Sequence, residues 1–300
     1  MFVVEDSVRA ALAAGQPVVA LESTIIAHGL PRPDNLRVAR EIEDVVRREG
    51  ATPATIAVLD GHVHIGLGDA ALLEIASRTD VAKASLRDLG LVLARGVPAA
   101  TTVASTAHLA ARAGIDVFAT GGLGGVHRGA SESFDESADL VALARSSIVV
   151  VCAGVKSILD VGATLERLET LSIPLVAYRS DRVAGFYLSD SGHDAPWRVD
   201  HPEEIAASVR ERRAVGLGEA TIVSNPLPVA EQMDPALHER VLADSLAAAE
   251  REGISGKDLT PFILGRFHHE TAGESLRANV ALVLQNARLA AQIARALASE

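Results

Sequence analysis

The chain has 300 residues, of which 48% are hydrophobic and 22% are charged, a composition that excludes an intrinsically disordered protein. Its net charge is −11 and it contains only six Phe, two Tyr and one Trp, so we expect no nucleic-acid polymer as a partner. The apolar runs are too short to cross a membrane and the N-terminal segment is unlike a secretory signal, which predicts a cytoplasmic protein with no membrane partner.

Short apolar runs recur along the chain and predict the strands of a sheet. Several of them are continuous rather than alternating, which is typical of strands that are buried on both faces. The predicted strands are residues 17–21, 55–59, 91–94, 116–119, 147–151, 174–178 and 221–223.

Amphipathic segments between these runs predict helices. In residues 35–48 the apolar side chains recur at helical spacing, and Asp34 suits the N-cap position. Strands that alternate with helices predict a three-layer α/β/α sandwich with a mostly parallel or mixed central sheet. Because no flexible linker divides the chain, we expect a single domain over residues 1–300. The other predicted helices are residues 70–78, 102–113, 157–170, 203–213, 235–252 and 274–298.

Residues 180–197 follow neither a strand nor a helix pattern, although they hold one of the two Tyr and the only Trp. A long irregular segment of this kind inside a compact domain predicts a functional loop or lid rather than a linker.

A glycine-rich segment follows the predicted strand 116–119. Five glycines fall within residues 121–129, but the spacing matches neither a P-loop nor a dinucleotide-binding turn. Backbone without side chains can approach an anion closely, and His127 or Arg128 could add positive charge. A sharp structural turn at the end of a strand is the alternative interpretation.

Three carboxylates, those of Asp135, Glu136 and Asp139, lie within five residues. Such a group suits a hard divalent cation such as Mg²⁺ or Mn²⁺, which would organise a phosphate and waters. The same residues, together with Ser137, could instead cap the helix that the apolar residues 140–144 predict.

Lysine is scarce, because it occurs only at positions 83, 156 and 257 among 28 basic residues. Lys156 stands where a buried strand is expected to meet a helix, and apolar walls and a helix N-terminus would both favour the neutral, nucleophilic amine. A lysine whose ammonium reaches solvent is the alternative. Lys83 could bind phosphate as a point charge.

Glu22 directly follows the predicted strand 17–21. A carboxylate at the end of a buried strand is costly unless it is paired, and such an environment suits general acid or base chemistry. A capping or ion-paired Glu is an equally simple interpretation.

Taken in chain order, these segments resemble the pseudouridine-5′-phosphate glycosidases, a family also known as indigoidine synthase A-like proteins. The resemblance extends across nearly the whole chain. The segments that carry it are residues 20–24 (ALEST), 28–31 (HGLP), 101–106 (TTVAST), 124–129 (GGVHRG), 137–140 (SADL), 153–160 (AGVKSILD) and 273–279 (GESLRAN).

The resemblance implies an activity: reversible cleavage of the C–C glycosidic bond of pseudouridine 5′-phosphate to uracil and ribose 5-phosphate. It further implies that Lys156 is the nucleophile, which forms an imine with C1′ of the ring-opened ribose, and that Glu22 is the proton donor. Asp135 would hold a divalent metal, usually Mn²⁺, and the protein would be a homotrimer. The residues expected to contact the substrate are Lys83, Val103, Thr120, His127, Ser137, Ala138, Asp139 and Asn279.

Two other functions use the same residues. A Schiff-base aldolase or lyase that acts on another sugar phosphate would need the same lysine, acid and phosphate loop. A non-catalytic nucleotide-binding protein would have the pocket without turnover. Of the glycosidase and the lyase, only the glycosidase should condense uracil with ribose 5-phosphate. The non-catalytic protein should form no covalent adduct on Lys156.

Overall fold

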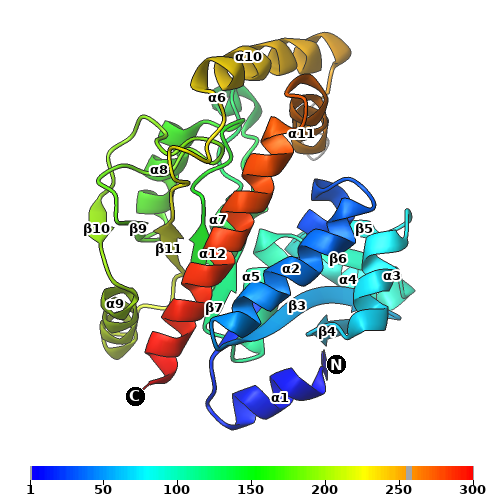
Figure 1. Ribbon diagram of the computed structural model, residues 1–300, viewed down its shortest axis with the longest axis vertical. Coiled ribbons are helices and arrows are strands. Elements are labelled where there is room, and N and C mark those ends of the chain that lie inside the picture. Colours follow the sequence, from blue (N-terminus) through cyan, green and yellow to red (C-terminus); the bar gives the residue numbers. More distant parts are fainter. Residues whose placement is uncertain (1, 255–258, 300) are drawn as a thin grey trace.

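A computed structural model describes residues 2–254 and 259–299 of the protein (Figure 1). Lys257 therefore lies outside the described residues. Within them, eleven strands form one sheet with the order β1-β4-β3-β2-β7-β8-β11-β9-β10, while β5 pairs with β6 and β6 with β3. The strands are β1 (Phe2–Val4), β2 (Val18–Leu21), β3 (Thr52–Leu59), β4 (His62–Ile65), β5 (Ala82–Ala84), β6 (Ala99–Thr101), β7 (Val117–Ala119), β8 (Val149–Cys152), β9 (Leu175–Tyr178), β10 (Trp197–Val199) and β11 (Thr221–Ser224).

The sheet is mostly parallel. From β3 through β2, β7, β8, β11 and β9 to β10, each strand runs parallel to its neighbours. The antiparallel pairs are β3 with β4 and β3 with β6. The carboxyl ends of the central strands therefore meet at one edge, which is where parallel α/β sheets bind their ligands.

Helices cover both faces of the sheet. They are α1 (Asp6–Ala13), a π-helix η1 (Ile25–Gly29), α2 (Asp34–Arg48), α3 (Asp69–Ser77), α4 (Leu86–Arg95), α5 (Val103–Arg112), α6 (Ala130–Ser133), α7 (Ala138–Leu143), α8 (Val161–Thr170), α9 (Pro202–Ala214), α10 (Pro235–Glu252), α11 (Leu259–Glu270) and α12 (Glu274–Ala298). None of the helices within residues 2–254 and 259–299 combines the length and the hydropathy that crossing a bilayer requires.

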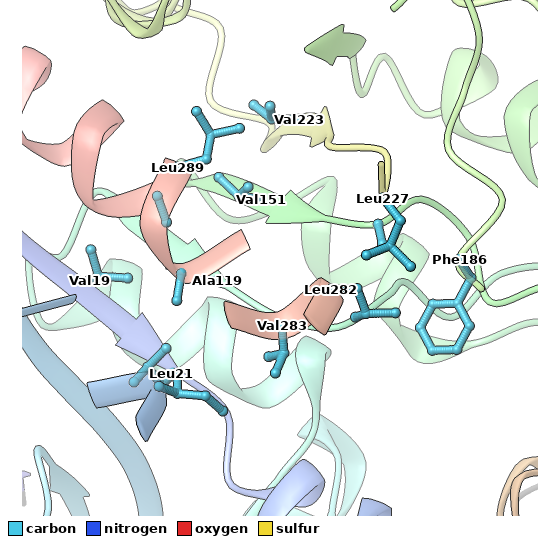
Figure 2. Close-up of a cluster of buried hydrophobic side chains, with 14 of the residues drawn as sticks. Val19, Leu21, Ala119, Val151, Phe186, Val223, Leu227, Leu282, Val283 and Leu289 are labelled. Atoms are coloured by element: carbon cyan, nitrogen blue, oxygen red, sulfur yellow. The ribbon is translucent and has the colours of Figure 1, made fainter. Parts of the chain in front are cut away.

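Alternate residues of the central strands point to opposite faces and so create two cores. Val19 and Leu21 of β2 pack on one face against α12, whose Leu282, Val283 and Leu289 cross the sheet (Figure 2). Helix α12, drawn in red, runs along this face with α2 beside it (Figure 1).

The other face has its own core. Phe118 of β7 is fully buried there, with residues of α5 and α7 around it. Two helical layers with a mixed sheet between them are the predicted α/β/α sandwich, so the fold class is confirmed. The single domain over residues 1–300 stays a prediction.

One predicted strand is wrong. Residues 91–94 form the second half of helix α4. The side chains of Leu89 and Val92 are buried while Leu91 is 63% exposed, which is helical spacing rather than that of a strand. The Ser85 amide donates to the Asp88 carboxylate at 3.1 Å, so a capping interaction at the start of α4 favours the helix.

Another boundary was also wrong, and it bears on Lys156. The helix expected over residues 157–170 begins at Val161, because Asp160 caps it by accepting the Ala163 amide at 2.9 Å. Lys156 therefore lies in the loop between β8 and α8, and the expected contribution of a helix N-terminus at Lys156 does not hold.

Candidate active site

A cavity of about 290 Å³ opens at the carboxyl edge of the sheet. Glu22 follows β2, and Lys156 lies four residues beyond β8. Strand β7 lies between β2 and β8 and runs parallel to both, so the two side chains enter the cavity from strand ends on either side of β7. The lining residues are Glu22, Thr24, Lys83, Ser85, Arg87, Thr102, Val103, Gly124, His127, Asp135, Glu136, Ser137, Ala138, Asp139, Lys156 and Leu159.

The residues that follow strand β6 form another wall of the cavity. Strand β6 pairs with β3 beyond the end of β2 and runs in the opposite direction, so that Thr101 meets Ser23. The Ser23 hydroxyl accepts the Thr101 amide at 2.9 Å and donates to the Ile56 carbonyl at 2.7 Å. These buried bonds fix Thr102 and Val103 against the cavity.

Glu22 has an environment suited to proton transfer. Burial raises the pKa of its carboxyl, while the Lys156 ammonium and the Thr120 hydroxyl act in the opposite direction. The Thr120 hydroxyl donates a hydrogen bond to the Glu22 carboxylate. A carboxyl group that is pushed toward its protonated form next to an amine can serve as a general acid.

The loop that carries Lys156 is held by two backbone hydrogen bonds to Leu123. The Lys156 amide donates to the Leu123 carbonyl at 3.0 Å, and the Leu123 amide donates to the Gly154 carbonyl at 3.0 Å. The glycine-rich segment and the loop after β8 therefore form a short backbone pairing, which fixes the Lys156 backbone at the cavity.

Two glycines of the glycine-rich segment lie in close contact with side chains of neighbouring segments. A Cβ on Gly124 would come within 2.2 Å of the Ser137 Oγ, and one on Gly125 within 2.3 Å of the Thr164 Oγ1. These close approaches favour the structural interpretation of the segment at both positions, although Gly124 also lines the cavity.

Asp139 connects two segments of the site. Its carboxylate accepts the Ala104 amide at 2.9 Å through Oδ1 and the Gly124 amide at 2.9 Å through Oδ2. Asp139 itself lies in the first turn of α7, and Ser137 is the N-cap that accepts its amide. The carboxylate thus fixes the start of α5 to the glycine-rich segment.

Hydrogen-bonding and cationic side chains gather in the same cavity. The hydroxyl groups of Ser85, Thr102 and Ser137 line it together with Lys83 and Arg87. Such a group of cations and hydroxyl donors suits a phosphate.

His127 and Asp135 form the pair that suits a metal ion. The His127 Nδ1 lies 3.8 Å from the Asp135 Oδ2 and is buried with no hydrogen-bond partner among the described residues. Burial lowers the pKa of His127 against the opposing effect of Asp135, which favours the neutral, ligating imidazole. The part of the chain that the structure describes holds no group of three or more His, Cys, Asp or Glu side chains around one metal position. A cation here would complete its shell with waters and a phosphate, as Mg²⁺-type sites do.

A second, smaller lobe of about 70 Å³ adjoins the cavity. The two lobes share Glu22, Thr24, Lys83 and Lys156, so the acid and both amines stand at their border. The smaller lobe is otherwise lined by Ile25, His28, Gly29, Gly121, Gly122, Phe186, Pro261, Leu264 and Asn279.

The structure brings together nearly all the residues that the sequence singled out. Of the predicted site residues, Asn279 lines the smaller lobe, and Thr120 lines neither lobe but reaches the site through its bond to Glu22. The others line the larger lobe: Glu22, Lys83, Val103, His127, Asp135, Ser137, Ala138, Asp139 and Lys156.

Other lining residues, notably Arg87, His28 and Phe186, are not among the site residues predicted from the sequence. Arg87 lies four residues after Lys83, and this proximity is a signal that could have identified it. Phe186 belongs to the predicted functional loop of residues 180–197, whose composition alone does not distinguish it.

The amino-acid sequence is similar to those of known proteins. Residues 7–296 match the family described as indigoidine synthase A like protein. The chain is 59% identical over 290 residues to a pseudouridine-5′-phosphate glycosidase of Salinispora tropica, covering 96% of this chain and 90% of the relative. A protein of the same name from Streptomyces griseus is 59% identical over 293 residues, covering 97% of this chain and 90% of the relative.

Two solved structures share the fold. The prealnumycin C-glycosynthase AlnA, in complex with ribulose 5-phosphate, superposes with a TM-score of 0.92 at 35% identity, covering 100% of this chain and 97% of that one. An indigoidine synthase A-like protein from Thermotoga maritima gives a TM-score of 0.87 at 37% identity, with 95% and 94% of the two chains covered.

Proposed function

The chain belongs to the indigoidine synthase A-like family, and we propose from this membership and from the names of its relatives that it is a C-glycosidase of pseudouridine 5′-phosphate. It cleaves the C–C glycosidic bond reversibly and gives uracil and ribose 5-phosphate. The observation that carries the proposal is the shared border of the two lobes, where both Lys156 and Glu22 lie. On one side is the larger, polar and cationic lobe, and on the other is the smaller lobe, whose lining includes the side-chain amide of Asn279.

The chemistry explains why an amine and an acid are needed together. Two carboxylates and an oxocarbenium-like transition state cleave C–O glycosidic bonds, but uracil bound through C5 is a poor leaving group. The Lys156 amine attacks C1′, forms the N–C1′ bond and breaks the C1′–O4′ bond, which opens the ribose ring. One proton of the resulting cationic nitrogen moves to O4′, which becomes the C4′ hydroxyl, and the nitrogen regains its lone pair.

The C–C bond then breaks with nitrogen as the electron source. The lone pair of the Lys156 nitrogen forms the C1′=N double bond, the electrons of the C1′–C5 bond remain on uracil, and C5 takes a proton from Glu22. Water adds to the iminium, and ribose 5-phosphate leaves with regeneration of the Lys156 amine. The sum is one pseudouridine 5′-phosphate and one water to one uracil and one ribose 5-phosphate.

We assign the phosphate to the larger lobe, with Lys83, Arg87, His127 and Ser137 as its ligands. Asp135, with His127 as a second donor, would hold a Mn²⁺ ion, which when bound organises the phosphate and waters.

Uracil then occupies the smaller lobe, where the Asn279 side chain offers an amide to its imide edge. Val103, Ala138 and Asp139 contact the ribose, while Thr120 orients Glu22. A homotrimer and a cytoplasmic location complete the proposal.

A trapping experiment distinguishes the two amines, because Lys83 and Lys156 line both lobes. Purified protein is incubated with Mn²⁺ and pseudouridine 5′-phosphate, uracil release is followed by chromatography, and borohydride reduces any imine formed with ribose 5-phosphate. We expect turnover and a reduced adduct on Lys156.

Alanine variants of the two lysines test which amine forms the imine. Lys156→Ala should lose both turnover and adduct, whereas Lys83→Ala should bind substrate more weakly but still form the adduct. An adduct mapped to Lys83, or normal turnover by Lys156→Ala, would refute the assignment. An adduct with ribose 5-phosphate, without any condensation of uracil and ribose 5-phosphate to pseudouridine 5′-phosphate, would favour a lyase for another sugar phosphate.

A further inference from the structure

Phe186 forms part of the wall of the smaller lobe in an unusual backbone conformation. Its side chain is 3% exposed, and its φ is 65°. Bulky residues rarely adopt the left-handed region, and such strain persists only where the surroundings impose it. The position therefore retains an aromatic ring where glycine would fit the backbone better.

The backbone around Phe186 is locked onto the end of β8. The Phe186 amide donates to the Ala153 carbonyl at 2.9 Å, and Gly154 pairs with Gly185 in an isolated bridge. A Cβ on Gly154 would come within 2.1 Å of the Ala184 carbonyl oxygen. The segment thus lies in close contact with the same loop that carries Lys156.

The ring itself is held by its neighbours. A Cβ on Gly122 would come within 2.6 Å of the Phe186 ring, so the ring packs directly on the Gly122 backbone. Tyr187 meets it edge-on at 4.5 Å between ring centroids and stacks on Phe267 at 5.4 Å. Figure 2 shows the Phe186 ring at the border of the core that contains Leu282 and Leu227. The wall cannot retreat without unpacking this aromatic group.

We propose that Phe186 is a specificity-determining residue, whose ring fixes the size of the aglycone that the smaller lobe accepts. The inference rests on the proposed function. A wall that is packed against backbone and two further rings does not adapt to a larger ligand, so the lobe admits a single pyrimidine ring and rejects bulkier carbon nucleophiles. Removal of the ring leaves space that a packed interior only partly closes.

The test uses the synthetic direction, with ribose 5-phosphate and four nucleophiles: uracil, 1-methyluracil, 1-benzyluracil and 3-benzyluracil. Each keeps the C5–H at which the new bond forms. Because 1-methyluracil and 1-benzyluracil both lack the N1–H and both keep the N3–H, the comparison of these two isolates the effect of bulk. Initial rates are measured for the wild type, Phe186→Ala and Phe186→Gly. The glycine variant removes the ring and the left-handed strain together, so it provides a second reading if the alanine variant folds poorly.

Leu282→Ala is the matched control. Leu282 is 1% exposed and packs beside Gly121, but it does not line the lobe. We expect the rate with one of the benzyluracils, relative to uracil, to rise about 10-fold or more in the Phe186 variants and to stay unchanged in Leu282→Ala.

Three results would overturn the inference. The first is an unchanged ratio in a Phe186 variant that still condenses uracil, and the second is an equal rise in Leu282→Ala, which would indicate general loosening. The third is a wild type that already accepts the benzyluracils as well as uracil. A wild type that condenses ribose 5-phosphate with none of these nucleophiles would instead refute the proposed function and this inference with it.

Discussion

The Nε2 of His238 lies 2.8 Å from the Oγ of Ser157, the residue that follows Lys156 in the chain. Both side chains are buried, and the imidazole packs beside Tyr187 and Phe267. Helix α10 thus supports the loop of the proposed nucleophile from behind, through a single hydrogen bond in an aromatic environment.

The burial of His238 should make the free energy of unfolding depend on pH. Burial lowers the pKa of His238 to about 4, and the Arg128 charge acts in the same direction, whereas an unfolded histidine titrates near 6.5. Between these values the unfolded state binds more protons. The contribution of His238 to the free energy of unfolding is therefore complete above about pH 6.5. It is lost as the pH falls toward 4, by roughly 3 kcal/mol in total.

Urea unfolding at several pH values, with wild type and His238→Gln, measures this contribution. The glutamine can still bond to Ser157 but does not titrate, so the free energy of unfolding should fall less steeply below pH 6.5 in the variant. Parallel curves for the two proteins would show that His238 is not the titrating group.

Asp139→Asn should destabilise the protein through one lost acceptor. The carboxylate accepts two buried amides, those of Ala104 and Gly124, and an asparagine has only one oxygen to offer. A buried amide left without a partner costs about 1–3 kcal/mol, and the loosened glycine-rich segment should lower turnover as well.

Thermal and urea unfolding check this expectation, with Asp69→Asn as control. The Asp69 side chain is 92% exposed, so its replacement should change stability by no more than about 0.5 kcal/mol. Equal stability of the two variants would show that the Asp139 bonds contribute little.

Thr120→Val should move the pH profile of cleavage in a defined direction. The Thr120 hydroxyl stabilises the Glu22 carboxylate and so lowers its pKa. Without that donor the pKa of Glu22 rises further. Because the proposed role requires protonated Glu22, the limb on which activity falls with rising pH should shift to higher pH.

The dependence of kcat/KM on pH, measured for wild type, Thr120→Val and Thr120→Ser, tests this expectation. The serine variant keeps the hydroxyl and should retain the wild-type profile. A shift to lower pH in the valine variant would contradict the role of Glu22 as the proton donor.

Parts of the fold with clear local signals could be predicted from the sequence. Helix α12 matches its predicted bounds of residues 274–298, because a long Ala/Leu-rich pattern follows a glycine. The run at residues 91–94 is different, since four consecutive apolar residues fit a strand or one turn of a helix. The packing of Leu89 and Val92 against the sheet and the capping interaction between Ser85 and Asp88 distinguish the two.

The site follows the same logic. Glu22 and Lys156 each come after a buried strand, and the carboxyl ends of parallel strands meet, so their proximity could be anticipated. The position of Phe186 could not, because it depends on a backbone bond to Ala153, 33 residues away in the chain. A positive φ at a phenylalanine leaves no trace in composition or periodicity.

Gly154→Ala should be among the most damaging single changes near the site. Gly154 has a φ of 83°, and a Cβ there would meet the Ala184 carbonyl oxygen at 2.1 Å. That oxygen belongs to the backbone, so relief requires movement of the whole segment that carries Phe186. We expect a loss of about 3 kcal/mol or more, measured by urea unfolding, together with a fall in turnover because the loop of Lys156 must shift.

Gly218→Ala provides the comparison for the same chemical change. No atom lies within 4 Å of a Cβ at Gly218, and its φ is outside the left-handed region. Alanine there reduces the freedom of the unfolded chain, so the free energy of unfolding should change by less than about 1 kcal/mol and turnover should stay at the wild-type level. If Gly154→Ala were as stable and as active as Gly218→Ala, the contact between Gly154 and Ala184 could not be what fixes the segment of Phe186 beside the nucleophile.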